Sequence, residues 1–197
     1  MSINRKKIIE LMSKIKVIGN ADGLIPAFGV YINQLPACFW NSFAEKLTCI
    51  VKPEIKEAAE YLLTYAANEC GYHTGHGIIN SEEWQAIVEP MIEKKPEDML
   101  HGIFAVITAW GWAKAEIAEL TPAERMVVRA YDYYESDIVR YGKSGKMSAY
   151  MITGISAAFM DLAYGKPYPD GLNTFRAKQI KGIEAGDDYA EFVVTKA

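Results

Sequence analysis

The sequence predicts an α+β fold: a four-stranded antiparallel sheet with helices packed over one face, plus an N-terminal helical extension. After Gly111 the apolar pattern changes from a helical period to a period of two, and residues 112–120 and 126–133 flank a short turn. Near the C-terminus, residues 173–180 run into a second turn and out again as residues 189–194, whose side chains alternate as in a strand with one buried face. Helices account for most of the rest, which is the pattern of an α+β domain.

Residues 147–164 form the most apolar of the predicted helices. Small or apolar side chains lie on nearly every side of this segment, and Gly165 follows where a helix C-cap places glycine. Because such a helix has almost no polar face, it must be buried. The hairpin of residues 173–194 is the nearest apolar partner.

Amphipathic helices precede the sheet. Pro53 suits the first turn of a long helix, which the glycine-rich residues 71–77 are expected to terminate. The predicted buried stripe of this helix comprises Ile55, Ala58, Ala59, Leu62, Leu63, Ala66, Ala67 and Cys70. Ser81 is the predicted N-cap of a helix that runs to about Lys94, and Pro96 opens another.

Residues 1–52 are predicted to be a helical extension, and residues 53–197 the main domain. A short amphipathic helix opens the chain, residues 19–23 break it, and a second helix is expected over residues 38–51. The extension carries many aromatic side chains and few charges. A segment this apolar is not expected to stand free in water, so it covers the domain or forms a subunit interface.

Composition and charge exclude several classes of protein. Half of the 197 residues are apolar, which suffices for a sizeable core, and the formal charge of −4 argues against nucleic acid as the main partner. No apolar run approaches the roughly 20 residues of a membrane-spanning helix, and the N-terminus does not have the pattern of a signal peptide. Cys38, Cys49 and Cys70 are an odd number without a disulfide pattern. We therefore expect a soluble protein of the reducing cytoplasm, without membrane insertion.

The C-terminal hairpin carries a family resemblance. Its sequence GIEAGDDYAEFVV, residues 182–194, resembles the closing hairpin of the 4-vinyl reductase domain family, and the small-residue helix and the run Tyr134-Glu135-Ser136 before it follow the family's order. The resemblance covers about residues 54–194. It implies the same α+β fold, which that family shares with haem-type nitric oxide sensors and a class of vesicle-tethering subunits. It also implies a site for small aromatic or hydrocarbon ligands.

The sequence departs from the family at its two hairpin cysteines. Gly182 and Ala190 stand at the matching positions, and their side chains supply no ligand atoms. The zinc that sensor relatives hold through those thiols is therefore not expected here. Haem is not expected either, and we predict no cofactor.

Large rings beside small residues are predicted to border an apolar pocket between the helix of residues 147–164 and the inner face of the sheet. Such an arrangement leaves a concave space with phenolic or indole donors at its edge, whereas a filled core is the alternative for each ring. His101 is a candidate hydrogen-bonding group of this pocket. The predicted ligand-binding residues are Trp110, Trp112, Tyr131, Tyr134, Tyr150, Gly154, Ala157 and His101.

Few residues support other chemistry. Cys70, His73 and His76 recur at intervals of three and would share one face of a continuous helix, as ligands of zinc or iron. The alternative is a buried cysteine beside histidines at a glycine-rich helix end, with no fourth ligand evident. No nucleophile motif or phosphate-binding loop occurs. Acidic residues in a turn usually serve solvation and backbone capping, and this applies to Glu184, Asp187 and Asp188, so no catalytic residue is assigned.

The function that these patterns favour is a cytosolic binding protein or sensor for a small, mostly apolar molecule, aromatic compounds included. One alternative is an enzyme or enzyme accessory of tetrapyrrole or aromatic metabolism, which rests on the name of the family alone. Another is a structural interaction module. A homodimer is expected, with residues 1–52 contributing to the contact, because the sheet edges and the apolar extension leave surface for a second copy to cover.

Overall fold

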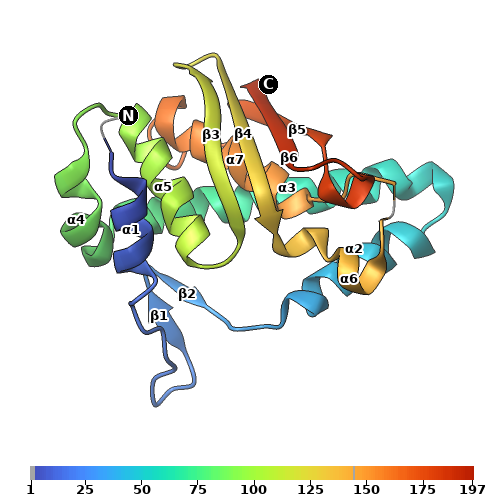
Figure 1. Ribbon diagram of the computed structural model, residues 1–197, viewed down its shortest axis with the longest axis horizontal. Helices are drawn as coiled ribbons and strands as arrows, with labels where there is room; N and C mark the ends of the chain where they lie inside the picture. Colours follow the sequence, from blue (N-terminus) through green and yellow to red (C-terminus); the bar gives the residue numbers. More distant parts are fainter. Residues whose placement is uncertain (1–2, 144) are drawn as a thin grey trace.

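The computed structural model describes residues 3–143 and 145–197, and its fold is α+β, as the sequence predicts (Figure 1). Four antiparallel strands form the main sheet in the order β3-β4-β6-β5. These strands are β3 Ala113–Thr121, β4 Arg125–Tyr133, β5 Phe175–Lys181 and β6 Ala190–Lys196. All four agree with the predicted strands to within a few residues, because period-two alternation identifies a half-buried strand reliably.

The central strands place their apolar residues on one face. Val128 of β4 pairs with Ile117 of β3 and with Phe192 of β6. Along β6, Ala190, Phe192 and Val194 are fully buried, whereas the residues between them are partly exposed. The alternation predicted for the last strand is therefore confirmed.

Helices and short turns of 3₁₀ helix make up most of the remaining chain. The α-helices are α1 Arg5–Met12, α2 Ala37–Ile50, α3 Pro53–Ile79, α4 Glu82–Ile87, α5 Glu97–Ala109, α6 Ile138–Tyr141 and α7 Tyr150–Tyr164. The 3₁₀ turns are η1 Glu89–Met91, η2 Tyr134–Ser136 and η3 Ile183–Ala185, and a separate hairpin consists of β1 Ile25–Ala27 and β2 Val30–Ile32.

The helices cover one face of the sheet in two layers (Figure 1). α5 packs on β3, α7 packs on β5 and β6, and α3 lies against the far side of α7. The core between sheet and helices is filled by apolar side chains such as Phe104, Phe159 and Phe192, with the rings of Phe104 and Phe159 5.3 Å apart.

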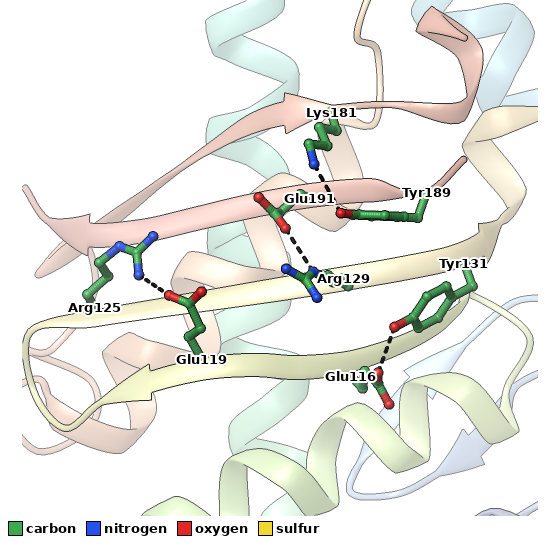
Figure 2. A network of polar contacts seen from close by, with 8 residues as sticks. All are labelled: Glu116, Glu119, Arg125, Arg129, Tyr131, Lys181, Tyr189 and Glu191. Atoms are coloured by element: carbon green, nitrogen blue, oxygen red, sulfur yellow. Dashed lines mark hydrogen bonds and ion pairs between the residues drawn. The ribbon is translucent and has the colours of Figure 1, made fainter. Parts of the chain in front are cut away.

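The opposite face of the sheet carries charged and aromatic side chains (Figure 2). The Nε atom of Arg129 lies 2.8 Å from Oε2 of Glu191, and the ammonium of Lys181 donates to the hydroxyl of Tyr189 at 3.0 Å. The same ring lies 5.3 Å from the guanidinium carbon of Arg129. Such a face is typical of a sheet that is packed on one side only.

α3 does not end at residues 71–77, as the glycines led us to expect, but continues to Ile79. The reason is that two of these glycines face α7 at close range. A Cβ atom on Gly71 would lie 2.8 Å from Cγ2 of Ile155, and one on Gly75 would lie 2.7 Å from Cδ1 of Leu162. Glycine therefore allows the two helices to approach here, and the packing compensates for its poor helix propensity.

The buried face of α3 also differs from the predicted stripe. Ile55 and Leu62 are 52% and 57% exposed, whereas Asn68 and Tyr72 are buried. The glycine-bearing side of the helix turns toward α7, so part of the apolar stripe points outward. This correction leaves large apolar side chains exposed on α3.

The N-terminal extension has two parts with different packing. α1 belongs to the core, since Ile8 and Met12 are fully buried and the helix packs against α5. α2 agrees with the predicted second helix, but Thr48 is its buried residue and it lies against the outside of α3 and η2. The β1–β2 hairpin between them was not predicted. It turns at Phe28 and Gly29, both at positive φ, and each of its strands has only three residues.

The helix predicted from Ser81 to about Lys94 is shorter than expected. Ser81 caps α4 as predicted, its hydroxyl oxygen accepting the N–H of Trp84 at 3.2 Å, but the helix ends at Ile87. Pro90 follows within η1, and the residue before a proline disfavours the α conformation.

Candidate functional site

A cavity of about 250 Å³ lies between α2, the first half of α3, η2 and the start of α7. Aromatic, apolar and acidic side chains meet around it. They include Trp40, Ala44, Cys49, Glu60, Tyr134, Glu135, Met147 and Tyr150. Aromatic walls with a few convergent polar groups are the usual composition of a small-molecule site.

The wall formed by α2 is connected to η2 by a side-chain hydrogen bond. The side-chain amide of Asn41 donates to the carbonyl oxygen of Tyr134 at 2.8 Å, which ties α2 to η2. Trp40, one turn from the start of α2, borders the cavity and is 41% exposed, so its ring lies at the boundary with solvent. The cavity therefore exists because α2 closes one side of it.

Glu135 of η2 caps the start of α7. Its Oε1 atom accepts the N–H of Met151 at 2.8 Å, and its Oε2 atom accepts the N–H of Ile152 at 3.0 Å. The backbone N–H of Tyr150 also interacts with this carboxylate. The N-cap residue of α7, Ala149, has no side-chain oxygen that could accept these N–H groups, as a Ser or Asp at the N-cap position would. Glu135, from η2, accepts them instead.

The environment of Glu135 opposes its ionisation. The residue is half-buried because it borders the cavity, but protein atoms surround its carboxyl group. This burial raises the pKa from the ordinary value of 4.5 to about 8, the three backbone N–H groups oppose the rise, and the nearby Glu184 adds to it. Glu135 is therefore largely protonated at neutral pH while the cavity is empty.

Glu184 approaches the same helix start from η3. It accepts the N–H of Ser148 at 2.9 Å and the side-chain amide of Gln179 at 2.8 Å, and the hydroxyl of Tyr133 donates to its other oxygen. The carbonyl oxygen of the Gln179 side chain accepts the N–H of Ala149 at 3.1 Å. The expected solvation of Glu184 is wrong, since it is 4% exposed, whereas the expected backbone capping is present in its bond from the N–H of Ser148. It bonds to segments far away in the sequence, which a local turn pattern does not reveal.

Two of the predicted ligand-binding residues border the cavity. Tyr134 and Tyr150 line it from η2 and α7, and the Tyr150 hydroxyl lies 3.3 Å from Oε1 of Glu60 on α3. Burial is the main cause that raises the pKa of both phenols, and acidic neighbours add to it. Both hydroxyls therefore remain protonated donors across the neutral range.

Three other predicted residues lie in α5 or just after it, and residues of the N-terminal extension contact His101 and Trp110. Trp110 packs on Phe28 of the β1–β2 hairpin, with ring centroids 4.4 Å apart, and Trp112 is half-buried. Nδ1 of His101 is buried and has no hydrogen-bond partner in the described residues, while burial lowers the pKa of the ring. A guanidinium N–H of Arg5 donates to the carbonyl oxygen of His101 at 2.6 Å. A role of His101, Trp110 and Trp112 in ligand binding stays a prediction.

The remaining three do not border a pocket between α7 and the sheet. A Cβ atom on Gly154 would lie 2.5 Å from the Cβ of Ala67, so this glycine faces α3 and no empty space. Ala157 is 2% exposed within the packed core. Tyr131 lies on the outer face of the sheet, 43% exposed, and its hydroxyl donates to Glu116 at 2.8 Å (Figure 2). The expectation that Gly154 leaves open space is wrong because α3, rather than solvent or ligand, occupies that side.

The histidines of the metal hypothesis have other neighbours. Nδ1 of His73 lies 2.9 Å from the hydroxyl of Tyr168, and the His76 ring stacks on the same tyrosine at 3.7 Å. Cys70 is exposed rather than buried, with its sulfur 3.8 Å from the Thr74 hydroxyl. Within residues 3–143 and 145–197, no group of three or more His, Cys, Asp or Glu side chains is placed to hold a metal ion.

The hairpin position at which the resemblance would require a thiol is also crowded. A Cβ atom on Gly182 would lie 2.7 Å from Nε2 of Gln179 and 2.8 Å from Oε1 of Glu184. A hydrogen-bonded carboxamide and carboxylate fill the space that a ligand sulfur and a zinc ion would need, so these residues do not fit a thiolate zinc site.

No protein-family model matches the sequence, and no curated protein matches it. Among solved structures, it is similar to the phenol-responsive sensory domain of the transcription activator PoxR, crystallised with phenol, with 14% identity and a TM-score of 0.62. The similarity covers 98% of this chain and 89% of that one. The chain therefore shares its overall fold with that domain.

A second similar structure is subunit 3 of a trafficking protein particle complex from Naegleria fowleri, covalently bound to palmitic acid. The identity is 13% and the TM-score 0.49, with 82% of this chain and 97% of that chain covered. Membership of the 4-vinyl reductase domain family stays a prediction. In the part of the chain that the structure describes, no helix combines the length and apolar character needed to cross a bilayer.

Replacing Glu135 by Gln is predicted to reduce the dependence of stability on pH. The pKa of this carboxyl is raised on folding to about 8, so its contribution to stability is fully present below about pH 4 and is lost as the pH rises through about 8. Unfolding in urea between these limits should show the wild type losing at least about 1 kcal/mol relative to Glu135→Gln as the pH rises.

The matched control is Glu124→Gln, which removes an exposed carboxylate at the β3–β4 turn. Asp161, whose pKa burial raises to about 6, acts in the same direction in every variant and cancels in the difference. Parallel stability curves for wild type and Glu135→Gln would contradict the prediction.

Proposed function

We propose that this protein binds a small, mostly apolar molecule, aromatic compounds included, in the cavity between α2, α3 and α7, and serves as a binding protein or sensor. The observation that carries the proposal is the cavity itself. Three rings from three different elements, Trp40, Tyr134 and Tyr150, border a space of about 250 Å³. A space just below the usual range of ~300–1,000 Å³ favours a small ligand.

The chemistry of the walls supports a ligand that is apolar with a polar group at one end. The rings and Met147 offer apolar surface, while Glu135 and the hydroxyl of Tyr150 offer polar atoms at one side. Few, fixed polar groups orient a ligand whose affinity comes chiefly from apolar burial.

Similarity to a solved structure also supports the proposal. The structurally similar domain of PoxR is described as phenol-responsive and was crystallised with phenol. This likeness makes small aromatic compounds the first class to test. The alternatives are an enzyme or accessory protein of aromatic or tetrapyrrole metabolism and a purely structural module, and the second of these predicts no ligand uptake at all.

We also propose that the protein forms a homodimer through α2 and the first half of α3, in the reducing cytoplasm. Apolar side chains are exposed along both helices. They are Phe39, Phe43 and Ile50 on α2, and Ile55 and Leu62 on α3. A contiguous set of large apolar side chains is uncommon on the surface of a monomer. The proposed contact lies on the outside of the same helix whose inner side borders the cavity.

Filling the cavity should abolish ligand uptake. Ala44 borders it from α2, and Ala44→Phe places a ring in the space, whereas the matched control Ala118→Phe places one at an exposed position of β3. Phenol and 2-phenylethanol, titrated into each protein and followed by calorimetry, should bind the wild type and the control alike and bind Ala44→Phe at least about tenfold more weakly. A wild type that takes up neither compound, or an Ala44→Phe protein that binds as well as the control, would refute the proposed site.

Introducing a charge at the exposed apolar surface should dissociate the dimer. Phe43→Glu places a carboxylate where the proposed contact is apolar, and the loss of a buried aromatic at an interface typically costs about 2 kcal/mol or more. Light scattering after size-exclusion chromatography should give a dimer for the wild type and for the control Lys178→Glu, which changes an exposed lysine of β5, and a monomer for Phe43→Glu. A monomeric wild type, or a dimer that survives the substitution, would rule out this interface.

A further inference from the structure

We infer that the ligand of this cavity is a small amine, with its ammonium group bound by the carboxylate of Glu135 and its apolar body against the rings of Trp40, Tyr134 and Tyr150. The inference rests on the proposed function, because it names the class of molecule that the same cavity holds. An amine differs in charge from the neutral aromatic compounds that structural similarity to the PoxR domain suggests as ligands.

The first observation concerns the partners of Glu135 in the described residues. Its hydrogen bonds come from backbone N–H groups of α7, and in the described residues no lysine or arginine forms an ion pair with it. Inside a protein, a carboxylate without a counter-charge is destabilising. A ligand ammonium that reaches this carboxylate supplies the missing charge, and a further lone pair remains to accept its hydrogen bond.

The second observation is the balance of charge around the cavity, which is negative. The acidic residues that line it are Glu45, Glu60, Glu135, Asp137 and Glu184, and the basic ones are Lys56 and Lys146. Lys56 lies 3.6 Å from Glu60, so part of this positive charge is already paired within α3. A cavity with an excess of carboxylates raises the local concentration of cations and disfavours anions.

The third observation is the placement of the rings. Trp40, Tyr134 and Tyr150 reach the cavity from α2, η2 and α7, so they surround the space from more than one side. The faces of tryptophan and tyrosine attract cations, and a site that combines aromatic faces with a carboxylate is a common way to hold an ammonium group. The same rings contact the apolar body of an arylalkylamine.

Protonation adds a measurable consequence. The Glu135 carboxyl of the empty cavity is largely protonated at neutral pH, since its pKa is about 8. Binding of an ammonium group to the carboxylate therefore releases one proton to solvent: the O–H bond of Glu135 breaks, and the ion pair with the ligand forms in its place. The affinity for an amine must accordingly rise as the pH rises toward about 8, while the affinity for a neutral molecule of the same shape does not.

Other charged or ionisable groups lie around the same cavity as Glu135. They are Glu184 on η3, Glu60 and Lys56 on α3, Glu45 on α2, Asp137 after η2, and Lys146 before α7, together with the hydroxyls of Tyr133, Tyr134 and Tyr150. A variant of Glu135 is therefore needed to assign the released proton to this residue.

The test uses the full chain and three probes that share a phenyl ring and differ in charge: 2-phenylethylamine, 2-phenylethanol and 3-phenylpropionate. Calorimetric titrations at about pH 8 should give the amine at least about tenfold higher affinity than the alcohol, and the acid the lowest affinity. Titrations near pH 7 in buffers of different ionisation enthalpy should show release of close to one proton for the amine and none for the alcohol. Glu135→Gln should remove both the preference and the proton release, whereas the control Glu124→Gln should keep both.

The outcomes separate this inference from the function on which it rests. If alcohol and amine bind the wild type equally, or if Glu135→Gln keeps the preference for the amine, the amine assignment is wrong and the proposed small-molecule site stands. If none of the three probes binds, the proposed function fails as well. If Glu135→Gln does not fold, the comparison of amine with alcohol and the proton release of the wild type still decide the question.

Discussion

The backbone N–H groups at the start of α7 must find acceptors inside the protein, because Ala149 and Ile152 are almost completely buried there. No residue of α7 supplies one. The side chains of Glu135 and Gln179 do so from η2 and β5, and Glu184 accepts the N–H just before the helix. These hydrogen bonds fix the positions of η2 and of the C-terminal hairpin relative to the start of α7. They also place the carboxyl groups of Glu135 and Glu184 beside the cavity.

The same constraint links structure to the proposed function. The carboxyl group of Glu135, which caps α7, lies at the edge of the cavity that α2 closes. Burial raises its pKa to about 8, so in the proposed function it stays largely protonated until a cationic ligand binds. α2 itself has one side toward the cavity and apolar side chains on the outside. The proposed ligand uptake and the proposed dimer contact therefore involve opposite sides of α2.

Features that depend on local patterns could be predicted from the sequence, and features that depend on distant contacts could not. The four strands and the α2 and α7 helices follow from periodicity and from the glycines and prolines beside them. The continuation of α3 through Gly71 and Gly75 could not be predicted, because it depends on the close approach of α7. Tyr134 and Tyr150 were identified as candidates for the cavity, but Glu135 was noted only for its place in the family's order. Its role depends on a helix start fifteen or so residues away, which a local pattern does not show.

The protonation state of the Glu135 side chain in the free protein tests the central claim most directly. The chemical shift of its carboxyl carbon, followed by NMR across the pH range and assigned with Glu135→Gln, reports this state without any ligand. The structure predicts a transition at about pH 8, because the carboxyl is buried without a counter-charge. A transition near the ordinary value of 4.5 would show that solvent or a cation already stabilises the carboxylate, and would contradict the account.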